Sequence, residues 1–251
     1  MIRWTVVVPF KGAADAKSRL SESFDGTERA AIALAFVVDT VSAVSRAPAV
    51  SSVIVVSNQP GLAEHLAAAH LTAAAGHAPG SAGMEARVIA DPGGGINAAV
   101  AAGLAHARAA APDAFAAAIT GDLAALRPAD LAQAFALAEA AATAGAQLAF
   151  VPDREGSGTT MVAFAPGAVS PTHFGIGSCA AHTAAGYRPL AVPAESSLRL
   201  DIDDADDLER ARLLGLGEAT LAVLARRVTP RSSDPATRPA HAPGAGRGRA
   251  R

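Results

Sequence analysis

The chain has 251 residues, of which 51% are hydrophobic and 18% are charged. This composition excludes a largely disordered protein, because disordered chains lack the apolar surface that a core requires. The single cysteine, Cys179, excludes an internal disulfide framework, and no apolar run reaches the roughly 18 residues of a membrane span. No signal-peptide pattern precedes the first strand-like run, so we expect a soluble cytoplasmic protein without a membrane partner.

The formal net charge of −2 is unevenly distributed along the chain. Residues 229–251 contain five arginines and one acid among many prolines and glycines, which is typical of a disordered basic tail. A basic tail can contact nucleic acid, but at this length we favour a solvated extension and expect no nucleic-acid partner. Residues 1–228 are then expected to form one domain.

Apolar runs alternate with helical patterns along this domain. The expected strands are Trp4–Pro9, Ser52–Ser57, Arg87–Ala90, Ala114–Thr120, Gln147–Val151 and Thr159–Phe164, with a strand end at Leu198–Ile202. The expected helices are Thr27–Ala47, a short helix from Pro60, Ile96–Arg108, Pro128–Thr143, Ser178–Ala185 and Ala205–Leu214. This alternation predicts an α/β fold with a mainly parallel central sheet and helices on both faces. Ligands of such sheets bind beyond the carboxyl ends of the strands.

The loop after the first expected strand contains both lysines of the chain, Lys11 and Lys17, together with Arg19. Small residues between them allow backbone N–H groups to approach an anion, and the cations add the charge that a triphosphate needs. The Walker A pattern G-x-x-x-x-G-K-[ST] is absent. We interpret this segment as a phosphate-binding loop, with a plain basic surface loop as the alternative.

A glycine-rich loop lies between the third expected strand and the next helix. Its residues with groups suited to nucleotide binding are Asp91, Gly93, Gly94, Gly95 and Asn97. Backbone amides and a helix N-terminus at such a position can hold a nucleotide. The spacing Gly93-x-Gly95-x-x-Ala98 also matches a relaxed dinucleotide fingerprint, so an NAD(P)-dependent oxidoreductase is an alternative. That fingerprint usually belongs to the first βα turn, and a purely structural tight turn also stays open.

Acidic residues follow two of the expected strands. Asp122 follows the fourth strand, and Asp201 and Asp203 are alternate residues of an extended segment, so their side chains can share a face. Carboxylates that converge on one point repel each other unless a divalent cation neutralises them, and oxygen ligands suit Mg²⁺ or Mn²⁺. We expect these three residues to bind metal, and we expect Asp204 to be the N-cap of the helix from Ala205.

Two further loops are rich in glycine and hydroxyl groups. They are Pro152–Thr160 and Phe174–Ser178, and Ser178 is expected to open a helix. Such loops can bind the phosphate or carboxylate of a small substrate. His173, His182 and Cys179 lack the spacing of metal ligands, so we expect structural roles for them. Three anion-binding loops beside an acidic cluster fit phosphate transfer better than hydride transfer.

The motifs VVPFKGAADAKSRLS, DPGGGINAA, GDLAALRP, PDREGSGTT, FGIGS and LRLDIDDADDL occur in this order, and the likeness that they carry spans residues 4 to about 214. Together they resemble the CofC/FbiD guanylyltransferases of deazaflavin coenzyme F-420 biosynthesis. This family is similar in fold to the molybdopterin-guanylyltransferase type of Rossmann-like nucleotidyltransferase. The chain departs from the family pattern at Ala124 and Ile176, neither of which is expected to supply a ligand atom.

The resemblance implies GTP-dependent transfer of GMP to phosphoenolpyruvate or 2-phospho-L-lactate. The alanine- and arginine-rich composition is typical of a protein from a high-GC genome, and this favours phosphoenolpyruvate. It implies Mg²⁺ as cofactor and passage of the product to the transferase that loads the deazaflavin precursor; homodimer formation and a different acceptor stay open. The implied catalytic residues are Lys17 and Asp122, with Mg²⁺ on Asp122, Asp201 and Asp203. The implied acceptor-binding residues are Thr160, Gly175 and Ser178, and the implied nucleotide-binding residues are Lys11, Lys17, Arg19, Asp91, Gly93, Gly94, Gly95 and Asn97.

Overall fold

The computed structural model describes residues 2–12, 20–21, 23–74 and 86–228, without the side chains of residues 70–74, 227 and 228. Lys17, Arg19 and the expected tail therefore lie outside the described residues. In the described part, seven strands form one sheet in the order β3-β2-β1-β4-β6-β5-β7. Their bounds are β1 Trp4–Pro9, β2 Val50–Val56, β3 Ala86–Ile89, β4 Phe115–Ile119, β5 Leu148–Pro152, β6 Thr159–Phe164 and β7 Arg188–Pro189.

The sheet is mainly parallel, as expected, with β6 as its antiparallel member. Strands β3, β2, β1 and β4 run parallel to one another, and β6 is antiparallel to both of its neighbours, β4 and β5. Only residues 153–158 connect β5 to β6, which is too short for a parallel crossover of a dozen or more residues. The reversal places the start of β6 beside the end of β4, where Thr120 N donates to Thr160 O at 3.0 Å.

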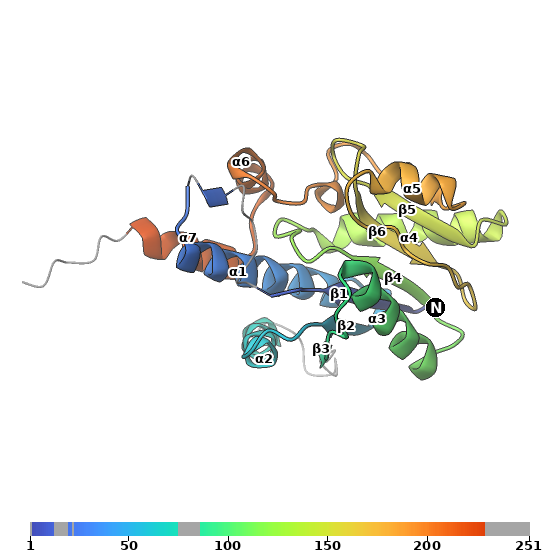
Figure 1. Ribbon diagram of the computed structural model, residues 1–251, viewed down its shortest axis with the longest axis horizontal. Coiled ribbons are helices and arrows are strands. Elements are labelled where there is room, and N and C mark those ends of the chain that lie inside the picture. Colours follow the sequence, from blue (N-terminus) through green and yellow to red (C-terminus); the bar gives the residue numbers. More distant parts are fainter. Residues whose placement is uncertain (1, 13–19, 22, 75–85, 229–251) are drawn as a thin grey trace, which may run out of the picture.

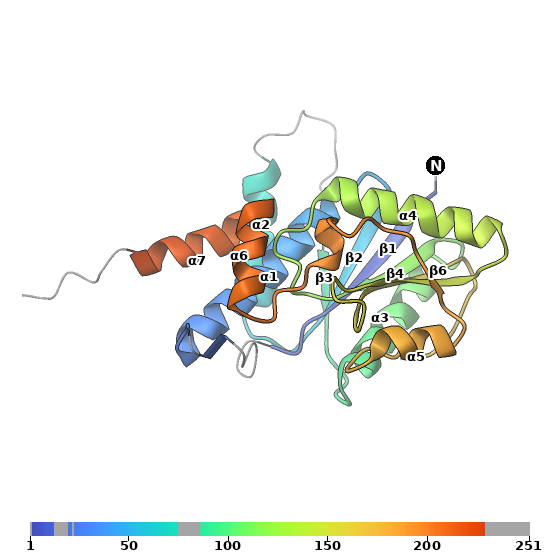
Figure 2. The same ribbon diagram turned by 90° about the horizontal axis from the view of Figure 1, so that it is seen from above.

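Helices cover both faces of the sheet. Their bounds are α1 Gly26–Ser45, α2 Leu62–Ala74, α3 Ile96–Ala110, α4 Pro128–Thr143, α5 Ser178–Ala184, α6 Ala205–Leu214 and α7 Glu218–Val228. Figure 2 shows α4 on one side of the sheet and α3 and α5 on the other. On the α1 and α4 side, Trp4 of β1 stacks on Phe135 of α4 with ring centroids 4.0 Å apart.

Helix α3 packs directly on β1 because Gly103 leaves room for the strand. A Cβ at Gly103 would overlap the side chain of Val7. Since α3 begins directly after the loop that follows β3, this packing holds its N-terminus at the carboxyl edge of the sheet. The same edge carries the loops that follow β1, β2 and β4 (Figure 1).

The prediction of a strand end at Leu198–Ile202 is wrong. Residues Ser197–Arg199 form a 3-10 turn, and Ser196 caps it by accepting a hydrogen bond from Leu198 N. Ser197 N donates to Asp130 Oδ2 at 2.8 Å, so helix α4 fixes this turn. Residues 200–203, which follow, belong to no helix and to no strand of the described sheet.

The C-terminal helix α7 was absent from the sequence-based expectation. It packs on α1, where the buried carboxylate of Asp39 accepts hydrogen bonds from Ala219 N and Thr220 N at 2.9 and 2.8 Å. Burial of that carboxyl raises its pKa. A Cβ at Gly217 would overlap Asp39, so the helix can approach this closely only with glycine there. None of the described helices combines the length and hydropathy needed to cross a bilayer.

Candidate active site

The expected acidic cluster forms at the carboxyl end of β4. Asp122 lies in the turn after this strand, and Ile202 N donates to Asp122 O at 3.2 Å, which holds the 201–203 segment alongside. Ile202 is fully buried, whereas its neighbours Asp201 and Asp203 are only partly buried. One carboxylate oxygen from each of Asp122, Asp201 and Asp203 lies within 4.8 Å of the others.

The electrostatics of this cluster fit a hard divalent cation. Burial raises the pKa of Asp201 to about 8, with further contributions from the carboxylates of Asp122 and Asp203 and a smaller one from Asp153. Like charges at this separation disfavour a second and third ionised carboxylate. A divalent cation with oxygen ligands removes that repulsion, and Mg²⁺ and Mn²⁺ both take such ligands. The three residues expected to bind metal are therefore brought together in a suitable arrangement.

Asp204 has the capping role expected for it. Its side chain accepts a hydrogen bond from Asp207 N at 3.0 Å and begins α6. Asp207 in turn accepts a bond from Asp203 N at 3.3 Å. The first turn of α6 thus fixes the backbone that carries one of the cluster carboxylates.

The glycine loop leads directly into α3. Gly93, Gly94 and Gly95 have φ angles of +80°, +85° and +89°, a conformation that favours glycine over every other residue. Asp91 accepts a bond from Gly93 N at 2.8 Å. Its backbone is bound twice by the side chain of Asn58, at 2.9 and 3.1 Å. The N-cap of α3 is Gly95, which has no side chain to cap the helix, and the first N–H groups of such a helix can donate to an anion or a polar ligand.

Asn97 connects two of the expected binding loops. Its carboxamide donates to Phe174 O at 3.0 Å and accepts from Phe174 N at 2.8 Å and from Thr172 Oγ1 at 2.9 Å. The side chain therefore ties the glycine loop to the loop that carries Gly175. Direct contact between Asn97 and a nucleotide stays a prediction, whereas this link between the loops is present in the structure.

Thr160 and Ser178 occupy positions suited to a small anionic substrate. Thr160 is fully buried, and its Oγ1 has no hydrogen-bond partner among the described residues. Thr120 directly follows the neighbouring strand β4, and its Oγ1 is likewise buried without a described partner. Buried hydroxyls are normally paired, so these two are available to a ligand. Ser178 opens α5 as expected, and Ser178 N donates to Gly175 O at 3.1 Å. Thr120 was not among the expected site residues.

The loop between β5 and β6 is fixed by residues that sequence reasoning did not single out. The Asp153 carboxylate accepts from Ser157 N at 3.0 Å and from Gly158 N at 2.6 Å. The Arg199 guanidinium donates to Asp153 O at 2.7 Å, and Cys179 N donates to Ser157 O at 3.2 Å. The PDREGSG and FGIGS loops therefore meet through α5.

His182 has the structural role expected for it. It is fully buried, and burial lowers its pKa from 6.5 to about 4, so its ring is neutral near pH 7. Nε2 accepts a hydrogen bond from His173 N at 3.0 Å, and Nδ1 lies 3.1 Å from Thr159 Oγ1. These bonds assign the proton to Nδ1 and tie α5 to the start of β6.

The loop expected to bind phosphate begins at the same edge of the sheet. Phe10 N donates to Val56 O at 2.9 Å, which extends the β1–β2 ladder by one residue. Lys11 follows and is exposed. A Cβ at Gly12 would lie 3.3 Å from Gln59 Oε1, so the described part of this loop runs beside the loop after β2.

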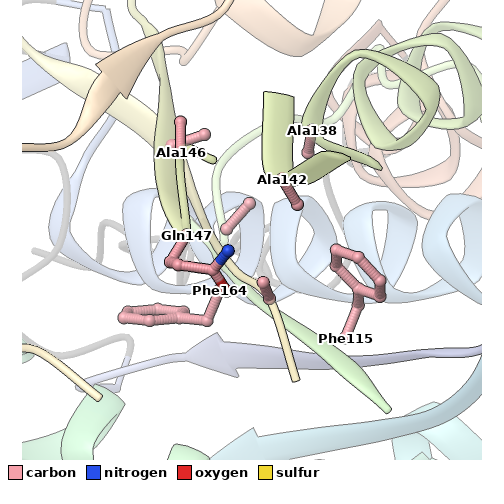
Figure 3. Close-up of a pocket in the computed structure, with 9 residues that line it drawn as sticks. Phe115, Ala138, Ala142, Ala146, Gln147 and Phe164 are labelled. Atoms are coloured by element: carbon pink, nitrogen blue, oxygen red, sulfur yellow. The ribbon is translucent and has the colours of Figure 1, made fainter. Parts of the chain in front are cut away.

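A small pocket between α4 and the sheet lies at the opposite edge. Six alanines, two phenylalanines and Gln147 line it, among them Phe115 at the start of β4 (Figure 3). It offers no titratable or nucleophilic side chain.

Comparison with known proteins supports the expected family. The family model of CofC-like guanylyl transferases matches residues 4–233. A phosphoenolpyruvate guanylyltransferase of Streptomyces coelicolor is 44% identical over 226 residues, covering 90% of this chain and 97% of that protein. One from Thermomonospora curvata is 43% identical, covering 90% of each chain.

A solved structure shares the fold at low identity. It is a Desulfovibrio desulfuricans G20 protein provisionally named a nucleotide-diphospho-sugar transferase, 15% identical, with a TM-score of 0.60 and coverage of 91% of this chain and 96% of that one. The family match also decides against the oxidoreductase alternative, and the glycine loop follows the third strand and not the first, where the dinucleotide fingerprint belongs. The chain belongs to the CofC-like guanylyl transferase family and is a nucleotidyltransferase.

Proposed function

We propose that the protein transfers GMP from GTP to phosphoenolpyruvate, releasing pyrophosphate, as a step of coenzyme F-420 biosynthesis. The observation that carries this proposal is the convergence of the Asp122, Asp201 and Asp203 carboxylates at one edge of the sheet. The glycine loop and the two loops expected to bind the acceptor, Pro152–Thr160 and Phe174–Ser178, follow strands or precede helices at the same edge. This arrangement suits a triphosphate, a cation and a small anionic acceptor together.

The choice of acceptor rests on the relatives and on the chemistry of the loops. Both relatives described above are named phosphoenolpyruvate guanylyltransferases. The buried hydroxyl of Thr160 and the turn from Gly175 to Ser178 offer hydrogen bonds suited to phosphate and carboxylate oxygens. 2-Phospho-L-lactate carries the same two groups, so it is the second acceptor to test.

The proposed reaction is an in-line displacement at the α-phosphorus of GTP. An oxygen of the acceptor's phosphate forms the new P–O bond, and the bond to the departing pyrophosphate breaks. The protein contributes mainly by positioning the reactants and neutralising charge. Lys17, with Lys11 and Arg19, would bind the triphosphate and stabilise the pyrophosphate as it leaves.

The remaining groups orient the reactants. Asp122, Asp201 and Asp203 would hold Mg²⁺, which when bound supplies charge neutralisation at the reacting phosphates. The Asp91–Asn97 loop would seat guanosine, with the exposed backbone amides of Gly94 and Gly95 as donors. The diphosphate product would then pass to the transferase that loads the deazaflavin precursor.

Mass spectrometry of reaction mixtures tests this function. The protein is incubated with Mg²⁺, one nucleoside triphosphate and one acid at a time, comparing GTP with ATP and CTP and phosphoenolpyruvate with 2-phospho-L-lactate and 3-phosphoglycerate. We expect the guanylylated adduct of phosphoenolpyruvate and stoichiometric pyrophosphate. Adduct formation with another acid alone would reassign the acceptor, and the absence of any adduct would overturn the proposal.

A further inference from the structure

A buried threonine in α1 contacts the backbone of the acidic cluster. Thr40 is fully buried, and its hydroxyl donates to Phe36 O at 2.8 Å, one turn earlier in the helix. The same oxygen accepts a hydrogen bond from Leu123 N at 3.1 Å, 83 positions away in the sequence. Leu123 directly follows the cluster residue Asp122.

The peptide unit between Asp122 and Leu123 is therefore held at both ends. Its N–H donates to Thr40 Oγ1, and its carbonyl accepts from Ile202 N at 3.2 Å. A peptide unit is planar, so two bonds on opposite sides fix its orientation and the position of the Asp122 Cα that belongs to it. Ile202 stands between Asp201 and Asp203, so this one unit joins the two halves of the cluster.

The turn also has little space to move toward α1. A Cβ at Gly121 would lie 3.2 Å from Pro9 O and 3.4 Å from Val37 Cγ2. Val37 belongs to the same helix as Thr40. Helix α1 thus supports the turn before and after Asp122, by packing at Gly121 and by a hydrogen bond at Leu123.

Converging carboxylates need such support. One carboxylate oxygen of each of the three residues lies within 4.8 Å of the others, and like charges this close repel one another. Residues that orient metal ligands from outside the ligand set commonly control affinity for the ion. Thr40 is such a residue for Asp122, because its hydroxyl contacts the backbone next to Asp122.

We propose that Thr40 is a positioning residue that sets the spacing between Asp122 and the pair Asp201 and Asp203, and thereby the affinity of the cluster for a divalent cation. This inference rests on the metal-binding role within the proposed function. Thr40 itself touches neither substrate nor ion. Its hydroxyl acts through the orientation of one peptide unit.

Direct Mn²⁺ binding tests the inference without relying on turnover. Mn²⁺ affinity is measured by electron paramagnetic resonance, with the protein alone and with saturating phosphoenolpyruvate. Thr40→Val keeps the side-chain shape but removes the hydroxyl, and we expect it to raise the dissociation constant about tenfold or more, within the range for residues that orient metal ligands. Thr40→Ser keeps the hydroxyl and should bind Mn²⁺ within about twofold of the unmodified protein.

Ser45→Ala is the matched control in the same helix. The Ser45 hydroxyl makes the equivalent bond to Val41 O at 2.8 Å, one turn earlier, so its loss reports the effect of removing such a helix hydroxyl. We expect unchanged Mn²⁺ affinity. Asp203→Asn, which removes a proposed ligand, should abolish binding.

The pair Thr40→Ala and Thr40→Ser keeps the test valid if the valine variant does not fold, since these two differ only by the hydroxyl. Folding is checked by circular dichroism at the assay temperature. Folded Val and Ala variants that bind Mn²⁺ like the unmodified protein would overturn the positioning role while leaving the metal site intact. If the unmodified protein transfers GMP but binds no Mn²⁺ in either condition, the metal site fails and the inference fails with it.

Discussion

The raised pKa of Asp201 predicts how the stability of the metal-free protein depends on pH. Burial, helped by the carboxylates of Asp122 and Asp203, raises this pKa from 3.8 to about 8. Between these values the folded protein binds a proton that the unfolded chain has released. The free energy of unfolding therefore falls as pH rises through this window.

His182 contributes a pH dependence of opposite sign. Its pKa is lowered from 6.5 to about 4, so the unfolded chain binds a proton that the folded protein does not, and stability rises with pH over that range. The two effects oppose each other below pH 6.5, and only the Asp201 effect continues above it. One proton corresponds to about 1.4 kcal/mol per pH unit, and the slope declines near the folded pKa. From pH 6.5 to pH 8, the free energy of unfolding should fall by roughly 1 to 2 kcal/mol.

Urea denaturation between these two pH values, in the presence of a chelator, measures this change. The unmodified protein should lose stability as pH rises, and Asp201→Asn should show a flat profile because asparagine does not titrate. Added Mg²⁺ should flatten the profile of the unmodified protein, since a bound cation favours the ionised carboxylates. Equal slopes in the two proteins would refute the raised pKa of Asp201 on which this prediction rests.

Kinetics test the expected site residues individually. Lys17→Ala should slow GMP transfer about 100- to 1000-fold if the loop stabilises transition-state charge, whereas Arg154→Ala, in an exposed loop, should have a mild effect; equal effects would contradict the assignment. Thr160→Val should raise the KM for phosphoenolpyruvate about 10- to 150-fold and spare the KM for GTP. Its melting temperature should change little, because the structure describes no hydrogen bond of that hydroxyl. Asn97→Ala, which breaks the link to Phe174, should also raise the KM for the acid; a selective rise in the KM for GTP would instead indicate direct nucleotide contact.

Local sequence patterns were sufficient to predict the bounds of several helices and strands. The bounds of β1, α4 and β6 agree with the expectation residue for residue. Strands β1 and β6 are buried at every position, and α4 has Pro128 in its first turn, where proline is favourable. Asp25 caps α1 with a reciprocal bond to Glu28, a capping box that depends only on residues three positions apart.

The elements that sequence reasoning missed depend on contacts between distant residues. Helix α7 is held by Asp39, some 180 positions earlier. The turn at Ser197–Arg199 replaces an expected strand because Asp130 of α4 accepts a bond from its backbone. No local periodicity reports such bonds, so the pattern could not distinguish a turn from a strand end.

The same division applies to the candidate site. The grouping of Asp122 with Asp201 and Asp203 was predictable, because ligands collect at the carboxyl ends of parallel strands and alternate residues of an extended segment share a face. The supports provided by Asn58 and Arg199 were not predictable. Their side chains bond to backbone groups 33 and 46 positions away, and such pairs leave no motif.

A comparison of Asp203→Asn with Asp204→Asn tests the central claim most directly. These adjacent aspartates differ in role, since Asp203 belongs to the carboxylate cluster and Asp204 caps α6. Pyrophosphate release and adduct formation with GTP, phosphoenolpyruvate and Mg²⁺ are measured for both variants, together with their melting temperatures. We predict that Asp203→Asn abolishes turnover in a folded protein, while Asp204→Asn retains it because asparagine caps a helix as well as aspartate does. Near-normal turnover of Asp203→Asn at limiting Mg²⁺ would contradict a metal-dependent guanylyl transfer at this site.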